Sequence, residues 1–207
     1  FGAEPHPNYN RILLSPVLAG EQTVDEIVLN DWSWYQEHGI ALHAGHTVTA
    51  VDRARRLVHA RGPGGEAVSA PYDRLILATG SNPFMLPIPG KDLAGVLAYR
   101  DIADTQAMID AAAKYRSAVV IGGGLLGLEA ANGLMKRGMD VSVVHIGPWL
   151  MERQLDEPAA RLLQKSLEEK GMKFLLQKQT AELVAGSGGT EAPGKLSEGD
   201  GKAAALA

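Results

Sequence analysis

A run of apolar residues that enters a glycine-rich turn constrains this sequence more than any other feature. Residues 118–121 are Ala-Val-Val-Ile, and Gly122-x-Gly124-x-x-Gly127 follows directly, ahead of a stretch of small residues. This order of strand, turn and helix is the fingerprint of a dinucleotide-binding fold. Gly122 permits the tight turn, Gly124 lets a pyrophosphate approach the backbone, and Gly127 lets the helix lie close to the strand. We therefore expect a nucleotide at the N-terminus of this helix, where backbone N–H groups are unpaired.

Because glycine-rich turns also occur for purely structural reasons, the residues beyond the turn matter. A ribose-binding Asp or Glu is usual about 20 residues after the fingerprint, at the end of the next strand. Residues 139–145 have the pattern of that strand, and His145 stands where the acid is usual. A neutral imidazole can hydrogen-bond a ribose hydroxyl, whereas a protonated one would tolerate a 2′-phosphate. The residue type leaves NADH and NADPH both open, with NADH slightly favoured.

The charge and the missing cysteines exclude several classes of function. The 207 residues carry a formal charge of −4 and contain no basic run, which argues against binding to nucleic acid. The sequence has no long apolar window and no secretory signal pattern, so we expect no membrane span. Without cysteine, these residues hold no thiolate metal site, iron–sulfur ligand or redox-active dithiol. A cytoplasmic setting fits this composition.

Strands and helices are predicted on both sides of the turn. Residues 47–52, 56–60 and 66–70 alternate in polarity, which predicts a small antiparallel β-meander. Helices are expected over 31–38 and 101–115 and from 156 to a stop at 171, and further strands over 40–43, 72–80 and 173–177. The segment from 118 to 177 therefore predicts a right-handed, doubly wound α/β unit.

The segment ahead of the turn makes a family resemblance visible. Residues 72–81, Tyr-Asp-Arg-Leu-Ile-Leu-Ala-Thr-Gly-Ser, look like the ATG strand of two-dinucleotide flavoprotein reductases, and the separation of Gly80 from Gly122 matches that family. The resemblance implies a glutathione-reductase-like fold with two Rossmann-like domains, both incomplete here. It implies an FAD-binding fragment over 1–112, an NAD(P)H-binding fragment over 113–185, and a flexible glycine-rich tail over 186–207.

Within that family, three segments are similar to the N-terminal part of the large subunit of assimilatory NAD(P)H nitrite reductases. They are residues 9–21, 122–131 and 150–156, and the last, Leu-Met-Glu-Arg-Gln-Leu-Asp, is the most particular. The resemblance also places a His at position 145. It implies hydride transfer from NAD(P)H to FAD, with electrons passed to a downstream domain or small subunit. The sirohaem and iron–sulfur centre would lie beyond this sequence, so we expect a piece of a longer protein that is inactive alone.

The same resemblance assigns cofactor contacts to residues outside the turn. Val48 matches a position whose backbone contacts the FAD adenine, Thr79 and Gly80 match the ATG turn, and Arg100 matches an arginine near the flavin nucleotide. Glu129, two residues after the last glycine of the turn, faces the nicotinamide side in the family. Their plain interpretations are a core strand residue, a strand end, a solvated charge before a helix and a carboxylate favoured by the helix dipole.

Other redox roles stay open. Pro16 stands where ferredoxin-reducing relatives carry Lys, and the segment Leu14-Ser15-Pro16 excludes the catalytic Cys of thiol-dependent relatives. We expect no side chain that acts as a general acid or base, and surface histidines rather than a metal site at His43 and His46. The alternatives are a ferredoxin- or rubredoxin-type reductase, an NADH-dependent flavin oxidoreductase, and an NAD(H)-sensing module without turnover.

Overall fold

The chain divides into two compact units. The computed structural model describes residues 1–185 and, as backbone, residues 202–206. Unit 1 comprises Phe1–Arg11 and Asp25–Ser81, and unit 2 comprises Ile12–Val24 and Asn82–Ala207. These units are defined by the packing of the chain, whereas the boundary expected at residue 112 separates the FAD-binding part from the NAD(P)H-binding part. The expected boundary therefore stays a prediction.

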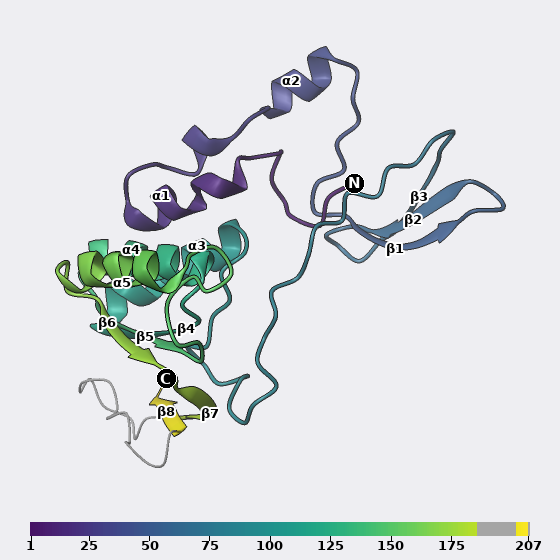
Figure 1. Cartoon of the computed structure of the whole chain (residues 1–207). Coiled ribbons are helices and arrows are strands. Elements are labelled where there is room, and N and C mark those ends of the chain that lie inside the picture. The colour runs from purple at the N-terminus through teal and green to yellow at the C-terminus, as the bar shows by residue number, and fades with distance from the viewer. Residues whose placement is uncertain (186–201, 207) are drawn as a thin grey trace. The chain divides into compact units, whose positions relative to one another are not determined.

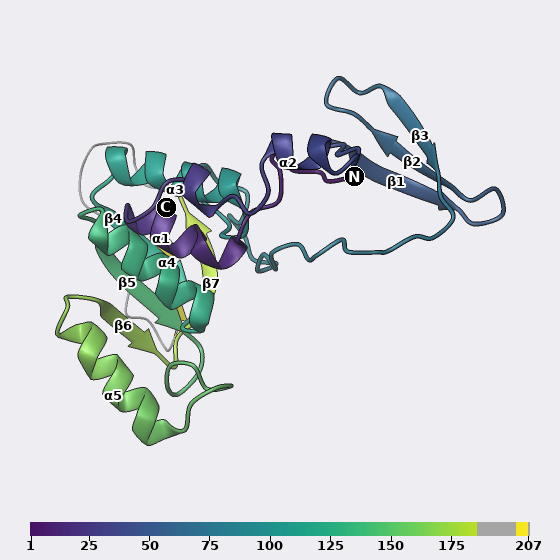
Figure 2. The same ribbon diagram turned by 90° about the horizontal axis from the view of Figure 1, so that it is seen from above.

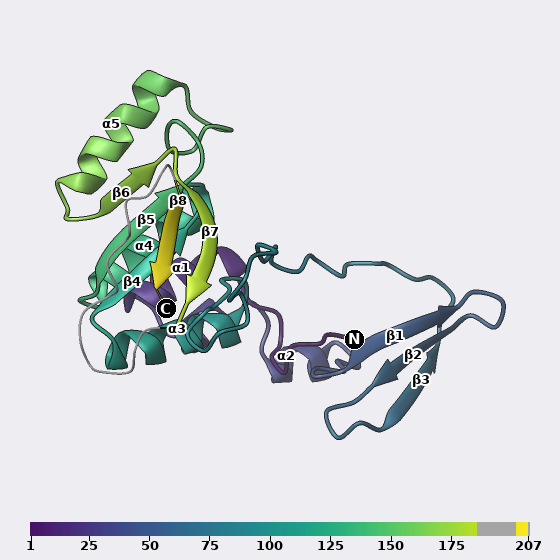
Figure 3. The same ribbon diagram turned by 90° about the horizontal axis from the view of Figure 1, so that it is seen from below.

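Unit 1 contains the predicted meander. Its antiparallel sheet has the order β1-β2-β3, with β1 at Thr47–Asp52, β2 at Leu57–Arg61 and β3 at Ala67–Pro71. These bounds agree with the expected ones to within one residue, and Figure 3 shows the three strands side by side. Val58 and Ala60 on the central strand are buried. The alternating pattern in the sequence therefore marked a sheet with one covered face.

A short helix precedes the meander in unit 1. The 3-10 helix η2 spans Asp25–Ile27 and α2 spans Trp32–Glu37. Asp31 caps α2 because its carboxylate accepts from the backbone N–H of Trp34 at 2.8 Å. Gly39, with a φ of 65°, follows the helix, as expected. The strand expected over 40–43 is wrong, because only an isolated bridge between Gly2 and Ala44 forms there.

The strand expected over residues 72–80 is also absent. From residue 73 to the start of α3 at Ile102–Lys114, the chain has neither a helix nor a strand. The side chains of Ile76 and Leu77 are 87% and 73% exposed. A strand exists only where a neighbour takes its N–H and C=O groups, and none of the described strands pairs with this segment. The apolar run is therefore an extended connection in this structure.

Unit 2 is built on a parallel sheet. Its strands are β4 at Ser117–Ile121, β5 at Asp140–His145 and β6 at Lys173–Leu176, in the order β4-β5-β6. The connecting helices are α4 at Leu125–Lys136 and α5 at Glu157–Glu168, and both lie on the same side of the sheet (Figure 1). The predicted succession of strand, helix, strand, helix and strand is confirmed. The central strand β5 carries the core, where Val141 and Val143 are fully buried.

An earlier segment of the chain joins unit 2 through α1. The 3-10 helix η1 spans Arg11–Leu13 and α1 spans Leu14–Ala19. Leu18, fully buried, fills the space over Gly133 of α4, where a Cβ would lie 2.6 Å from the Leu18 Cγ. The Arg137 guanidinium donates to the carbonyls of Val17 and Leu18. Figure 2 shows α1 beside α4, and this packing fixes the position of Ser15 on α1.

The C-terminal part of the described chain adds a strand pair. β7 at Gln179–Val184 pairs in parallel with β8 at Lys202–Leu206. Of the expected flexible tail over 186–207, residues 186–201 and 207 lie outside the described residues, and 202–206 form β8. Within the part of the chain that the structure describes, no helix has the length and apolar character needed to span a membrane.

Candidate functional site

The glycine turn has the geometry that its sequence predicts. Gly122 has a φ of 120°, which non-glycine residues rarely adopt. A Cβ on Gly127 would lie 2.0 Å from the carbonyl oxygen of Gly122, so only glycine lets α4 approach β4 this closely. No heavy atom lies within 4 Å of the Cβ position of Gly124. Of the three fingerprint glycines, Gly122 provides the positive φ, Gly127 provides the close packing of helix on turn, and Gly124, with open space at its Cβ position, is the N-cap of α4.

The N-terminus of α4 is available to a ligand. Gly124 is the N-cap and provides no side chain to bond the first N–H groups of the helix. The next two side chains, Leu125 and Leu126, are 55% and 54% exposed. Unpaired N–H groups at the positive end of a helix dipole suit an anion such as a pyrophosphate.

The middle residue of the turn, Gly123, is fixed from the other side by β5. Its backbone N–H donates to Nδ1 of His145 at 3.1 Å, and its carbonyl accepts from the N–H of Met151 at 3.0 Å. A Cβ at position 123 would lie 2.8 Å from both His145 Cγ and Leu150 Cδ2. Gly123 is therefore a glycine because the imidazole and a buried leucine fill the space beside it.

His145 is buried, with both ring nitrogens engaged. Nδ1 accepts from Gly123, so the ring proton lies on Nε2, which faces Oε2 of Glu152 at 2.9 Å. The side chain is only 7% exposed. We expected the imidazole to contact the ribose directly. In the structure no ring nitrogen is left for that contact, because the turn and Glu152 use both.

Glu152 is a residue that sequence reasoning did not select. Burial alone would raise the pKa of its carboxyl, but bonds to its own backbone amide and to His145, together with nearby charge that includes Arg153, lower the pKa overall. The side chain is 36% exposed. The signal for Glu152 lay in the segment 150–156, but spacing alone could not show that this carboxylate bonds to His145.

A second hydrogen-bonded group surrounds Glu129. Ser15 Oγ donates to Oε2 of Glu129 at 2.6 Å and lies 3.0 Å from the hydroxyl of Tyr99. Because a serine has a single proton, and here Glu129 accepts it, Tyr99 is the donor to Ser15. Burial raises the pKa of the Tyr99 phenol above 10, and the charge of Glu129 raises it further. Tyr99 and Ser15 were not predicted as site residues.

The expected flavin contacts do not form one site within a unit. Val48 lies on β1 and is 42% exposed, which does not fit a core strand residue. Thr79 and Gly80 are exposed in the unpaired connection of unit 1. Arg100 is half-buried in unit 2, just before the N-cap of α3, Asp101. The residues expected to bind NAD(P)H, which are Gly122, Gly124, Gly127, Glu129 and His145, all lie within unit 2.

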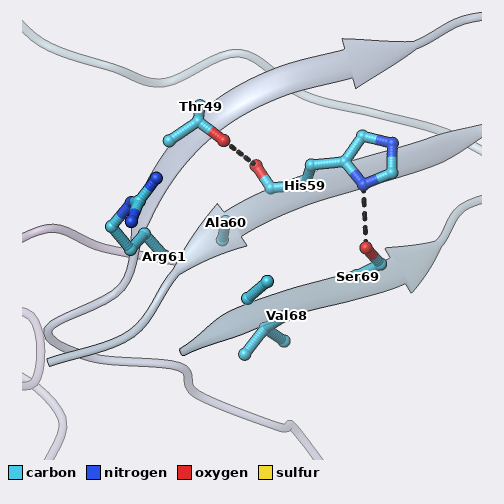
Figure 4. A pocket seen from close by; sticks show the side chains of 7 residues that line it. Thr49, His59, Ala60, Arg61, Val68 and Ser69 are labelled. Carbon is cyan, nitrogen blue, oxygen red and sulfur yellow. Dashed lines mark hydrogen bonds between the residues drawn. The ribbon is translucent and has the colours of Figure 1, made fainter. Parts of the chain in front are cut away.

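A shallow pocket lies elsewhere, on the meander (Figure 4). Thr49 Oγ1 donates to the carbonyl of His59 at 3.3 Å, and Nδ1 of His59 bonds to Ser69 Oγ at 2.8 Å. These bonds tie the three strands together. The pocket contains no predicted site residue, so we regard its polar groups as part of the sheet.

The histidine pair of unit 1 packs against the first residue. The ring of His43 stacks on Phe1 with centroids 4.4 Å apart, and Nδ1 of His46 bonds to the carbonyl of Ala44 at 2.8 Å. Over residues 1–185, the described side chains form no group of three or more His, Cys, Asp or Glu that could hold a metal ion.

Comparison with known proteins gives matches over nearly the whole chain. The model of the family described as pyridine nucleotide-disulphide oxidoreductase matches residues 1–206. The nitrite reductase (NAD(P)H) of Bacillus subtilis (strain 168) is 59% identical over 184 residues, which are 89% of this chain and 22% of that protein. The assimilatory nitrate reductase electron transfer subunit of the same organism is 52% identical, over 93% of this chain and 24% of that protein. The chain thus spans less than a quarter of the length of these relatives.

The fold is also found in solved structures. An NAD-dependent persulfide reductase from A. fulgidus superposes with a TM-score of 0.82 at 26% identity, covering 88% of this chain and 35% of that one. This match confirms the predicted α/β class with Rossmann-like architecture.

Proposed function

Because the chain belongs to the pyridine nucleotide-disulphide oxidoreductase family, we propose that it is a flavoprotein module that binds NAD(P)H and passes hydride to FAD. The observation that carries this proposal is the turn at the start of α4. Its open glycine and uncapped helix N-terminus fit a pyrophosphate, and its packed glycine lets the helix lie close enough to β4.

The chain positions the nucleotide through three features. Backbone N–H groups at the start of α4 bind the pyrophosphate, and the end of β5 lies beside the adenosine half. Glu129, on the first half of α4, faces the nicotinamide, and Ser15 and Tyr99 hold its carboxylate in one orientation. When bound, the two cofactors supply the chemistry, which is hydride transfer from the nicotinamide to the flavin. No side chain of the chain acts as an acid or base in this proposal.

FAD is assigned to Val48, Thr79, Gly80 and Arg100. The sequence contains one G-x-G-x-x-G turn, which the proposal gives to NAD(P)H, so these four residues are only part of a flavin site. Val48, Thr79 and Gly80 belong to unit 1, and Arg100 belongs to unit 2.

For the whole protein, we propose that the electrons go on to nitrite. The name of the Bacillus subtilis relative at 59% identity supports this, as does the Leu-Met-Glu-Arg-Gln-Leu-Asp segment. A sirohaem and iron–sulfur centre would then accept the electrons in a downstream domain or a small subunit. A cytoplasmic location suits this role, since assimilated nitrite is used inside the cell.

Anaerobic mixing of the full-length protein with NADH or NADPH tests the module. We expect a bound flavin whose visible absorption band bleaches on mixing. The variant Gly124→Val fills the open position at the turn and should retain flavin but bleach at least about tenfold more slowly at low nucleotide concentration. Gly2→Val is the matched control, because its Cβ position in unit 1 is equally open. A colourless protein, or a flavin that neither nucleotide reduces, would leave an NAD(H)-sensing module as the better reading.

A further inference from the structure

Position 145 is where a ribose-binding acid is usual, and the side chain at this position is hydrogen-bonded to the carboxylate of Glu152. His145 ends β5 and stands at that position, but its ring is buried and both of its nitrogens have partners. Nε2 of the ring bonds to Oε2 of Glu152, whose side chain is 36% exposed. The negative charge at the end of this strand therefore comes from Glu152 and not from the strand itself.

The segment that carries Glu152 is fixed to the glycine turn. Leu150 is fully buried, and the N–H of Met151 donates to the carbonyl of Gly123 at 3.0 Å. Met151 has a φ of 57°, which is uncommon for a residue with a side chain. A Cβ on Gly147 would lie 2.6 Å from Nε2 of His145, so glycine is also required on that side of the ring. These contacts hold the Glu152 carboxylate at a defined place beside the turn.

The chemistry of Glu152 suits a ribose diol. Hydrogen bonds lower the pKa of its carboxyl, so it is ionised at neutral pH. An ionised carboxylate accepts through two oxygens with about four lone-pair sites, so one bond from His145 leaves capacity for hydroxyl donors. The same charge repels a phosphate on the 2′ oxygen.

We propose that Glu152, held in place by His145, binds the ribose hydroxyls of the adenosine half of NADH and disfavours the 2′-phosphate of NADPH. This inference rests on the proposed function, because it assumes that the nucleotide lies on the turn at 122–127. His145 is then a positioning residue, which connects the carboxylate to the backbone of the turn. His145, at the end of β5, thus influences the choice of nucleotide by positioning Glu152.

The Glu152→Gln variant of the full-length flavoprotein tests the proposal. Glutamine keeps the length of the side chain and an oxygen that can accept from Nε2 of His145, but it removes the charge. We expect the ratio of kcat/KM for NADH to kcat/KM for NADPH, measured as flavin reduction, to fall about tenfold. Calorimetry with NAD⁺ and NADP⁺ should show the same change in relative affinity. Glu152→Asp keeps the charge but withdraws it by one carbon, so it should lie between wild type and Glu152→Gln.

Glu157→Gln is the matched control, since it removes an exposed carboxylate at the start of α5 that is paired with Arg161. Its ratio should equal that of the wild type. An unchanged ratio in Glu152→Gln, or an equal fall in Glu157→Gln, would overturn the inference while leaving the proposed function intact. Failure of both nucleotides to reduce the flavin or to bind to the wild-type protein would instead overturn the proposed function.

Discussion

Two neighbouring glycines in the turn have opposite surroundings. His145 and Leu150 fill the space beside Gly123, whereas the space beside Gly124 is open. We expect Gly123→Ala to lower the free energy of unfolding by about 1–3 kcal/mol, because the added methyl must displace the ring or the leucine. Denaturant unfolding of the full-length protein measures this. Gly124→Ala should lose less, about 0.5–1 kcal/mol, because its Cβ position is open and only the poorer N-cap preference of alanine acts against it. An equal loss in both variants would contradict the geometry.

Tyr99 should make the free energy of unfolding depend on pH in the alkaline range. Its pKa is raised above 10, first by burial, so the folded protein holds the phenol proton more tightly than the unfolded chain. The resulting stability is complete below the unfolded value near 10 and is lost as pH rises through the raised value. We expect the free energy of unfolding to fall more steeply above pH 10 in the wild type than in Tyr99→Phe. Parallel curves for the two proteins would show that Tyr99 titrates normally.

The sequence predicts residues of the site only where a local rule exists. The three glycines of the fingerprint and the end of β5 follow from spacing, since backbone geometry fixes both. The partners of Glu129 do not, because Ser15 reaches it across 114 positions and Tyr99 reaches Ser15 across 84. No spacing rule predicts a contact between side chains that are so far apart in the sequence. Direct ribose contact by His145 was predicted from its position alone, and the position says nothing of which atoms the ring already bonds.

At the scale of elements, the packing of α1 on α4 positions Ser15. Leu18 is fully buried against Gly133, so Leu18→Ala should lower the free energy of unfolding by about 2–5 kcal/mol. It should also slow flavin reduction by NADH, because Ser15 then loses its fixed place beside Glu129. Thermal unfolding and stopped-flow absorbance of the full-length protein measure the two effects. Ile12→Ala, at a side chain that is 80% exposed in the same segment, should change neither, and a similar loss there would argue against the helix contact.

Strands whose hydrogen-bonded neighbour strands lie within the described residues were predicted well. The meander and the strands of the parallel sheet each pair with a neighbour close in sequence, so periodicity and turn residues were sufficient. The strand expected over 72–80 failed for the opposite reason. Its apolar run has the composition of a buried strand, but strand formation depends on a partner that a local pattern does not contain.

At the scale of the whole molecule, the two units carry different parts of the proposed reaction. The nucleotide turn, Glu129 and its partners belong to unit 2, which is complete enough to have its own core. The expected FAD contacts are divided between both units, and the chain spans less than a quarter of its relatives. The residues proposed to bind NAD(P)H therefore lie in one unit, whereas those proposed to bind FAD lie in both.

The exposed apolar connection of unit 1 leads to a prediction about a protein of the relatives' length. Covering a large aliphatic side chain stabilises a fold by about 1.5–3 kcal/mol, and Ile76 and Leu77 expose most of their surface here. We expect residues 74–80 to form a hydrogen-bonded strand in a protein of the relatives' length, so their amides should be protected from hydrogen exchange. Exchange followed by mass spectrometry measures this, with the exposed turn at 53–56 as the fast reference and buried β5 as the slow one. Exchange at 74–80 as fast as in the turn would mean that the segment stays an extended connection without strand pairing in a protein of that length too.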